Sequence, residues 1–335
     1  MTDPLISVII VNYNGKNYLK ECLKHVLASD YDRFEIIVVD NGSTDSSPEL
    51  VREIMRKTDK PLKLLVNPFN VGPAKARNQA ADLAVGELLA FLDNDTRPDP
   101  GWLKEAVNLL KDPKIGALQC KLILDRDDKL LDSIGAYLGS FGFLVQKVPP
   151  GKVRDVGQFN EVTDIFSTKS AGMLIRKTLF DKIGRFDPDY FIYNEEMDLC
   201  WRVWTAGYKV VFAPNSVVYH NSGSTRRVAA EIADELLYFH GIKNYLLTVL
   251  KNVDSNAFLK TVIPHMVAWL AISILMTFRK RPIISYYILR GILWNLRHMK
   301  ITMKKRARNI GRKQLPKHIL VHLPLRNYLD TLKRF

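Results

Sequence analysis

Cysteine is scarce in this chain of 335 residues, and its scarcity narrows the classes of protein to consider. The three cysteines, Cys22, Cys120 and Cys200, are far apart and form no CxxC pair. Disulfide scaffolds and cysteine-based zinc sites need paired or closely spaced cysteines. The sequence therefore favours a reducing compartment over either of those classes.

Two other features are missing near the N-terminus. The segment MTDPLISVIIVNYNG has no basic stretch before its apolar run, so it does not predict a signal peptide. The turn that follows this run, NYNGKNY, lacks the GxGxxG spacing of dinucleotide-binding Rossmann domains. The sequence therefore disfavours an enzyme that binds a nicotinamide or flavin dinucleotide.

Acidic residues are sparse in the last third of the chain, which dominates the net charge of +14. Residues 1–220 hold 28 Lys and Arg against 30 Asp and Glu, whereas residues 221–335 hold 21 against 5. A nearly neutral body thus carries a strongly basic tail. Such a tail indicates an anionic partner, either nucleic acid or a phospholipid surface.

The first 220 residues alternate strand and helix patterns. Apolar, β-branched runs predict strands at 6–11, 35–40, 62–66 and 88–92, and helices are predicted near 16–27, 46–57, 73–85 and 100–110. This alternation predicts an α/β fold with a mostly parallel sheet flanked by helices, and a site beyond the carboxyl ends of its strands. We further predict a long excursion at 125–168, a helix at 195–206, short strands at 209–213 and 216–220, and a domain boundary near 224.

Three of the predicted strands end on polar residues, which would meet at one edge of the sheet. The first is followed by Asn12 and Tyr13, the second ends on Asp40 and Asn41, and the fourth runs into Asp93-Asn94-Asp95. Two carboxylates one residue apart can offer oxygens to one divalent cation. The residues alone leave an alternative, in which Asp95 caps the turn before Pro98 and Asp40 forms an Asx turn.

Four segments in this order carry a resemblance to a known family: SVIIVNYNG, IIVVDNGSTD, AFLDNDT and YNEEMDLCWRVWTAGYKVVFAPNSVVYH. Over residues 5–222 the chain resembles the family 2 glycosyltransferases, inverting enzymes with the GT-A fold. Their rhamnosyltransferase-like and galactofuranosyltransferase-like members, which build cell-surface glycans, are the most similar subgroup. The resemblance implies a catalytic domain at 1–224, with a nucleotide-sugar half at 1–95 and an acceptor half at 96–224.

The same resemblance implies a reaction and its site. A nucleotide-diphosphate sugar, UDP- or dTDP-linked, would donate a sugar to a lipid-linked or growing glycan with the help of Mn²⁺ or Mg²⁺. The resemblance implies three metal ligands, Asp95, Asp93 and His220. The implied contacts to the nucleotide sugar are Asn12, Tyr13, Asp40, Asn41, Arg77, Asp93 and Asn94. The implied catalytic acids are Glu196 as base, its neighbour Glu195, and Asp198 as a supporting group.

Each of these roles has a plainer alternative. Arg77 would otherwise be a solvated charge on a helix, and His220 a packing or capping residue. Acids in the first turn of a helix, such as Glu195 and Glu196, also complement the helix dipole without any catalytic part.

The basic tail, residues 225–335, contains two apolar stretches. Residues 262–278 form 17 positions without Asp, Glu, Lys or Arg, which at about 1.5 Å per residue fall short of a hydrocarbon core of about 30 Å. Basic clusters at 279–281 and 300–308 flank the second stretch. Because a simple span would place one basic cluster on the far side, we predict helices lying in the interface, or a shallow hairpin, at the cytoplasmic face of the cell membrane.

Other interpretations of the tail and of the activity stay open from sequence. The apolar stretches could pack on the catalytic domain or form a dimer contact. The enzyme could instead glycosylate a polyprenyl phosphate directly, although such an acceptor has less need of the acidic Glu195-Glu196 pair. A nucleic-acid-binding protein is disfavoured, because aromatic residues are not interleaved among the charges at 300–313.

Overall fold

The computed structural model describes residues 3–127, 129–222, 235–309 and 314–322. Its first elements confirm the predicted alternation of strands and helices. They are β1 (Ile6–Asn12), α1 (Lys16–Leu27), β2 (Phe34–Asp40), α2 (Ser47–Lys57), β3 (Leu62–Val66), α3 (Pro73–Leu83), β4 (Leu88–Asp93), β5 (Thr96–Pro98) and α4 (Trp102–Leu110).

The second part of the chain contains the two longest strands of the described residues, β6 (Ile115–Leu124) and β12 (Lys209–His220), and a long connection between β6 and β11 (Met173–Arg176). Its main helices are α5 (Lys177–Lys182) and α6 (Glu195–Thr205). The two short strands predicted at 209–213 and 216–220 are wrong: they are one strand, β12. Its register against β6 shifts between Ala213 and Val217, because Pro214 lies there and cannot donate a ladder hydrogen bond.

The predicted excursion at 125–168 contains several short strands. These are β7 (Leu131–Ser133), β8 (Ala136–Gly139), β9 (Leu144–Gln146) and β10 (Thr163–Asp164). β8 pairs with β9 and with β13 (Leu320–Val321), which comes from the far end of the chain. The excursion is therefore folded against the C-terminal part of the molecule.

The main sheet brings the polar strand ends together, as predicted. Its order is β10, β12, β6, β11, β4, β1, β2 and β3, with β5 on β12 and β7 on β6. β1 lies parallel between β2 and β4, in a register that pairs Asn12 with Asp40 and Val11 with Asp93. Along β1, Ile9 packs in the cluster with α3 and α6, whereas Val8 and Ile10 pack in the cluster with α1 and α4. Both faces of the sheet are covered, which explains its continuous apolar strands.

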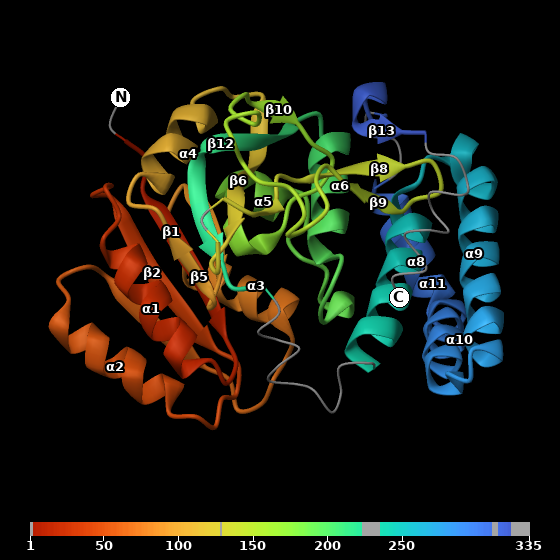
Figure 1. Cartoon of the computed structure of the whole chain (residues 1–335), viewed down its shortest axis with the longest axis horizontal. Coiled ribbons are helices and arrows are strands. Elements are labelled where there is room, and N and C mark those ends of the chain that lie inside the picture. The colour runs from red at the N-terminus through yellow and green to blue at the C-terminus, as the bar shows by residue number, and fades with distance from the viewer. Residues whose placement is uncertain (1–2, 128, 223–234, 310–313, 323–335) are drawn as a thin grey trace.

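The C-terminal helices lie beside α6, on the side of the molecule away from α1 and α2 (Figure 1). After a π-helical turn (Glu235–His240) they are α8 (Gly241–Asn252), α9 (Phe258–Phe278), α10 (Pro282–Arg297) and α11 (Met299–Asn309). Leu247, Val249 and Val253 belong to the same core as the sheet. The predicted domain boundary near 224 falls outside the described residues. α8 nevertheless packs against the sheet and the helices of the first 220 residues.

Candidate active site

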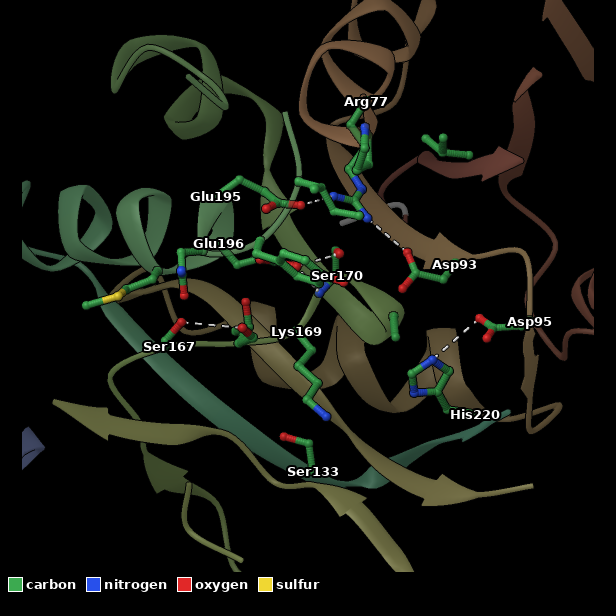
Figure 2. A pocket seen from close by; sticks show the side chains of 18 of the residues that line it. Arg77, Asp93, Asp95, Ser133, Ser167, Lys169, Ser170, Glu195, Glu196 and His220 are labelled. Carbon is green, nitrogen blue, oxygen red and sulfur yellow. Dashed lines mark hydrogen bonds and ion pairs between the residues drawn. The ribbon is translucent and has the colours of Figure 1, made fainter. Parts of the chain in front are cut away.

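A cavity of about 710 Å³ lies at the carboxyl ends of β1 and β4, where α6 begins (Figure 2). Most of the side chains predicted for the site line it. They are Tyr13, Asn41, Arg77, Asp93, Asn94, Asp95, Glu195, Glu196 and His220. The segment that brings the acids is far from the strand ends in sequence, so the cavity is built by the fold as a whole.

Asn12 and Asp40 lie behind the cavity wall, where both are fully buried. The Asn12 amide donates to Asp40 Oδ2 at 3.0 Å and accepts from Asn94 Nδ2 at 2.7 Å. Asp40 Oδ1 also accepts from the backbone N–H of Ser43 at 2.9 Å. This bond reaches the third residue on and not the second, so Asp40 stabilises the turn without forming the Asx turn offered as an alternative. A Cβ on Gly15 would lie 2.0 Å from Asn94 Nδ2, so this wall requires glycine there.

Asp93, Asp95 and His220 form a cluster whose potential ligand atoms lie within 4.8 Å of one another. The two aspartates come from the end of β4, and His220 is the last residue of β12. His220 Nε2 lies 3.4 Å from Asp95 Oδ1 (Figure 2). Two carboxylates and one imidazole form a donor set that suits Mn²⁺ well, and Mg²⁺ through the carboxylates. The residues present thus fit the predicted divalent cation.

His220 is held from behind by Asp132, a residue that the sequence interpretation missed. Asp132 Oδ2 lies 2.9 Å from His220 Nδ1 and 2.9 Å from Lys169 Nζ. Burial opposes a charge on His220, but its bonds to Asp132 and Asp95 outweigh burial and raise its pKa to about 10. A cation bound at Nε2 must replace that proton, so its affinity should rise with pH.

We expect Asp132→Asn to weaken Mn²⁺ binding by about tenfold to a hundredfold, the usual cost of losing a carboxylate behind a ligating histidine. The carboxylate keeps the second imidazole proton on Nδ1 and leaves Nε2 for the metal. Electron paramagnetic resonance of free Mn²⁺ measures this affinity without requiring turnover. Asp155→Asn is the matched control, because Asp155 is paired with Lys121 at 2.6 Å and does not line the cavity. Equal affinities in the two variants would contradict this role of Asp132.

Arg77 is buried between two acids and is not a solvated helix charge. Its Nη2 lies 2.9 Å from Asp93 Oδ1, and its Nη1 lies 2.8 Å from Glu195 Oε1 (Figure 2). Burial raises the pKa of Glu195 and the nearby Glu196 adds to this, while Arg77 opposes it. Arg77 therefore links the end of β4, through Asp93, to the start of α6, through Glu195. The Glu195 carboxylate is occupied by its ion pair with Arg77.

Glu196, in contrast, is partly exposed to the cavity. Its Oε1 accepts from the Ser170 hydroxyl at 2.6 Å and from the Ser170 backbone N–H at 3.0 Å (Figure 2). These two bonds fix the direction of the carboxylate. Of the two glutamates, Glu196 is the one placed to meet a substrate hydroxyl.

The loop before these glutamates has an unusual backbone, with positive φ at Phe191, Tyr193 and Asn194. Non-glycine residues in this region are strained and need support from their surroundings. Asn244 of α8 supplies it: its Nδ2 lies within 2.8 Å of the carbonyl oxygens of Tyr190, Ile192 and Tyr193. A helix of the predicted tail thus shapes the active site.

Asp198 does not reach the cavity, and its predicted supporting role needs correction. It is fully buried one turn into α6, where its carboxylate lies 2.7 Å from Arg202 Nη2 and 2.9 Å from Lys251 Nζ. Because a helix places residues two positions apart on different faces, Asp198 points away from Glu196. Its ion pair with Lys251 holds α8 against α6. Asp198 therefore affects the site through the packing of these two helices.

Comparison with known proteins agrees with this geometry. The sequence model of the family described as Glycosyl transferase family 2 matches residues 7–184. The chain therefore belongs to glycosyl transferase family 2, as predicted.

Two relatives illustrate the range of similarity. The O-antigen biosynthesis protein RfbC of Myxococcus xanthus is 31% identical over 252 residues, which make up 72% of this chain and 19% of RfbC. Glycosyltransferase AglE of Haloferax volcanii is 27% identical over 221 residues, or 65% of this chain and 67% of AglE. The chain thus spans about a fifth of RfbC and about two thirds of AglE.

Solved structures share the fold at low sequence identity. The mannosyltransferase PcManGT from Pyrobaculum calidifontis, in complex with GDP-Man and Mn²⁺, has a TM-score of 0.58 at 19% identity and matches over 88% of both chains. Residues 1–349 of TarS of S. aureus, in complex with UDP, have a TM-score of 0.56 at 17% identity and match over 91% of this chain and 88% of that fragment. These neighbours support the predicted GT-A fold.

Proposed function

We propose that this protein is a glycosyltransferase that inverts the anomeric centre of a nucleotide-diphosphate sugar as it transfers the sugar to a hydroxyl of a lipid-linked or growing glycan. One observation carries the proposal: Glu196 faces the same cavity as the cluster of Asp93, Asp95 and His220. A base on one side and a diphosphate-binding cluster on the other are what a single displacement needs.

The donor would lie between the strand ends and the start of α6. Asp93, Asp95 and His220 would hold Mn²⁺ or Mg²⁺, and a bound ion neutralises the charge that develops on a departing diphosphate. Tyr13 and Asn41 line the same cavity on the side of β1 and β2, where they would contact the nucleoside. PcManGT binds GDP-Man and TarS binds UDP in their structures, and we propose a UDP- or dTDP-linked sugar here.

Glu196 would act as the base of a single step. Its carboxylate takes the proton of the acceptor hydroxyl while that oxygen forms a bond to the anomeric carbon. The bond from the anomeric carbon to the diphosphate oxygen breaks, and the nucleoside diphosphate leaves with the electron pair. Ser170 keeps the carboxylate oriented through its hydroxyl and its backbone N–H.

Titration calorimetry with a panel of UDP-, dTDP- and GDP-linked sugars tests the donor. We expect one nucleotide class to bind with Mn²⁺ present and to lose affinity in EDTA. Transfer to a glycan acceptor, followed by NMR of the product's anomeric proton, tests inversion. Retained configuration, or no binding of any nucleotide sugar by the folded protein, would rule out the proposal.

We also propose that the enzyme works at the cytoplasmic face of the membrane, held there by the outer faces of α9 and α10. Among the described residues, one helix, Ser255–Phe278, is long and apolar enough to cross a membrane. One side of α9 packs in the protein through residues such as His265, Trp269 and Met276. The opposite side exposes Leu259, Ile263, Val267, Leu270, Ile274, Leu275 and Phe278.

This outer face supports a flat position on the membrane better than a span. α9 is held on one side by the protein, while its other side is apolar and uncovered within the described residues. The turn between α9 and α10 carries the exposed Arg279, Lys280 and Arg281. Basic residues at the headgroups attract anionic lipid by about 1 kcal/mol each, and this attraction weakens with salt.

We expect the full-length protein to sediment with anionic vesicles in low salt and much less with neutral vesicles. Ile274→Glu should weaken this binding, because Ile274 is 60% exposed on the outer face of α9. Val85→Glu is the matched control. Val85 is 68% exposed, but it follows α3 and lies outside the C-terminal helices. If both variants bind vesicles like the unmodified protein, the outer face of α9 is not the anchor.

A further inference from the structure

A second, narrow cavity of about 150 Å³ opens beside the catalytic cavity and has no role in the proposed reaction. The two cavities share the lining residues Tyr193, Asn194, Leu237 and Tyr245, so the smaller adjoins the larger. We call the smaller one the side groove. Its shared end begins directly before Glu195, the residue next to the proposed base.

The far end of the side groove is apolar and is lined by Trp269 of α9. The Trp269 indole N–H donates to His265 Nε2 at 3.0 Å, and His265 Nδ1 bonds the carbonyl oxygen of Phe141 at 2.8 Å. Burial lowers the pKa of His265 to about 4, so this ring is neutral. The polar atoms of these two rings therefore bond to groups of the protein. Trp269 lines the groove with its indole ring, beside the side chain of Ile242.

The side groove therefore leads from the start of α6 to the helix that we place on the membrane. Trp269 faces inward, while its neighbour Leu270 is exposed on the outer face of α9. Figure 1 shows α8 between α6 and α9, and α8 supplies Gly241, Ile242 and Tyr245 to the groove. A chain lying along the side groove would have one end beside the cavity that holds Glu196 and the other end beside α9.

We propose that the side groove binds the first carbons of the hydrocarbon chain of a lipid-linked acceptor. This inference rests on the proposed function, and it specifies how the acceptor is recognised: through its chain as well as its sugar. A hydrocarbon chain fits a narrow apolar groove that adjoins a polar reaction site. A second protein would need an interface of about 800 Å² on each partner, which a groove of this size does not provide.

Gly241 offers a way to fill the groove without disturbing the fold. A Cβ built on Gly241 meets nothing within 4 Å, and its backbone is in a conformation open to other residues. Because Gly241 lines the groove, we expect the ring of Gly241→Phe to occupy it. Gly241→Ala makes the same change to the backbone and fills little space, so it is the matched control. Thermal unfolding of both variants shows whether the fold is kept.

The probe is a C15 isoprenoid phosphate with a diazirine in its first isoprene unit, next to the phosphate. After photolysis, we expect mass spectrometry to find it on residues 238–245 or at Trp269 in the unmodified protein and in Gly241→Ala. This labelling should be lost in Gly241→Phe. Labelling that is unchanged in Gly241→Phe, or confined to outer-face residues such as Leu270 and Ile274, would overturn the inference.

Nucleotide-sugar binding by the unmodified protein is measured in the same preparation. If the donor binds and the chain does not label the groove, the inference fails while the proposed function stands. If no donor binds, the proposed function itself fails.

Discussion

Glu196→Gln is expected to slow sugar transfer by about a hundredfold or more, the usual loss when a general base is removed. The amide still accepts a hydrogen bond from Ser170, which in the unmodified protein holds Glu196 Oε1 at 2.6 Å from its hydroxyl. It cannot take the proton of the acceptor hydroxyl. Donor affinity, measured by calorimetry, should therefore stay near its original value while single-turnover transfer falls.

Glu195→Gln is the informative comparison, because the two glutamates are adjacent in sequence and differ in their surroundings. Glu195 is buried against Arg77, so its amide would keep a hydrogen bond to the guanidinium and lose only the charge. We expect a smaller loss of transfer than in Glu196→Gln. If instead Glu195→Gln is inactive and Glu196→Gln transfers normally, Glu195 is the base.

The strands and the location of the site were predictable because local patterns determine them. The continuous apolar runs of β1, β2 and β4 each end on polar residues, and parallel strands bring those ends to one edge. The prediction of two short strands, one on each side of Pro214, was wrong. They form one strand, β12, because β12 pairs with β6 on both sides of a bulge.

Contacts between distant segments were beyond the reach of these patterns. Asp132 lies in a polar stretch with no periodic signal, and only its pairing on β6 brings it to His220. Lys169 and Ser170 are also ordinary polar residues in sequence. Asn244 is one of several polar residues in α8, next to Lys243 and one turn before Thr248, so its sequence did not single it out as the residue that holds the loop.

The tail shows why composition alone gives an incomplete answer. Its charge and apolar runs favoured a membrane surface, with packing on the catalytic domain as an alternative. The structure shows packing through α8 and through ion pairs such as Lys251 with Asp198 and Lys305 with Asp187. It also leaves the outer faces of α9 and α10 apolar. The two interpretations are compatible, because they concern opposite sides of the same helices.

Asp95→Asn is expected to abolish transfer while the protein stays folded. Asp95 follows the last residue of β4 and faces Asp93 and His220 in the cluster that would bind the cation. An amide oxygen is a weaker ligand than a carboxylate, and the site would lose one of its two negative charges opposite the diphosphate. Paramagnetic resonance should show lost Mn²⁺ binding in this variant, and EDTA should abolish transfer by the unmodified enzyme.

A matched control separates this effect from a general loss of negative charge. Asp32 is fully exposed on the surface, and Asp32→Asn removes the same charge outside the cavity. Because a metal-ligand role depends on position and a long-range role depends on charge, Asp32→Asn should keep both Mn²⁺ binding and transfer. If Asp95→Asn transfers sugar normally in EDTA, the diphosphate is stabilised without a metal. Arg77, already paired with Asp93, would then be the cation to examine.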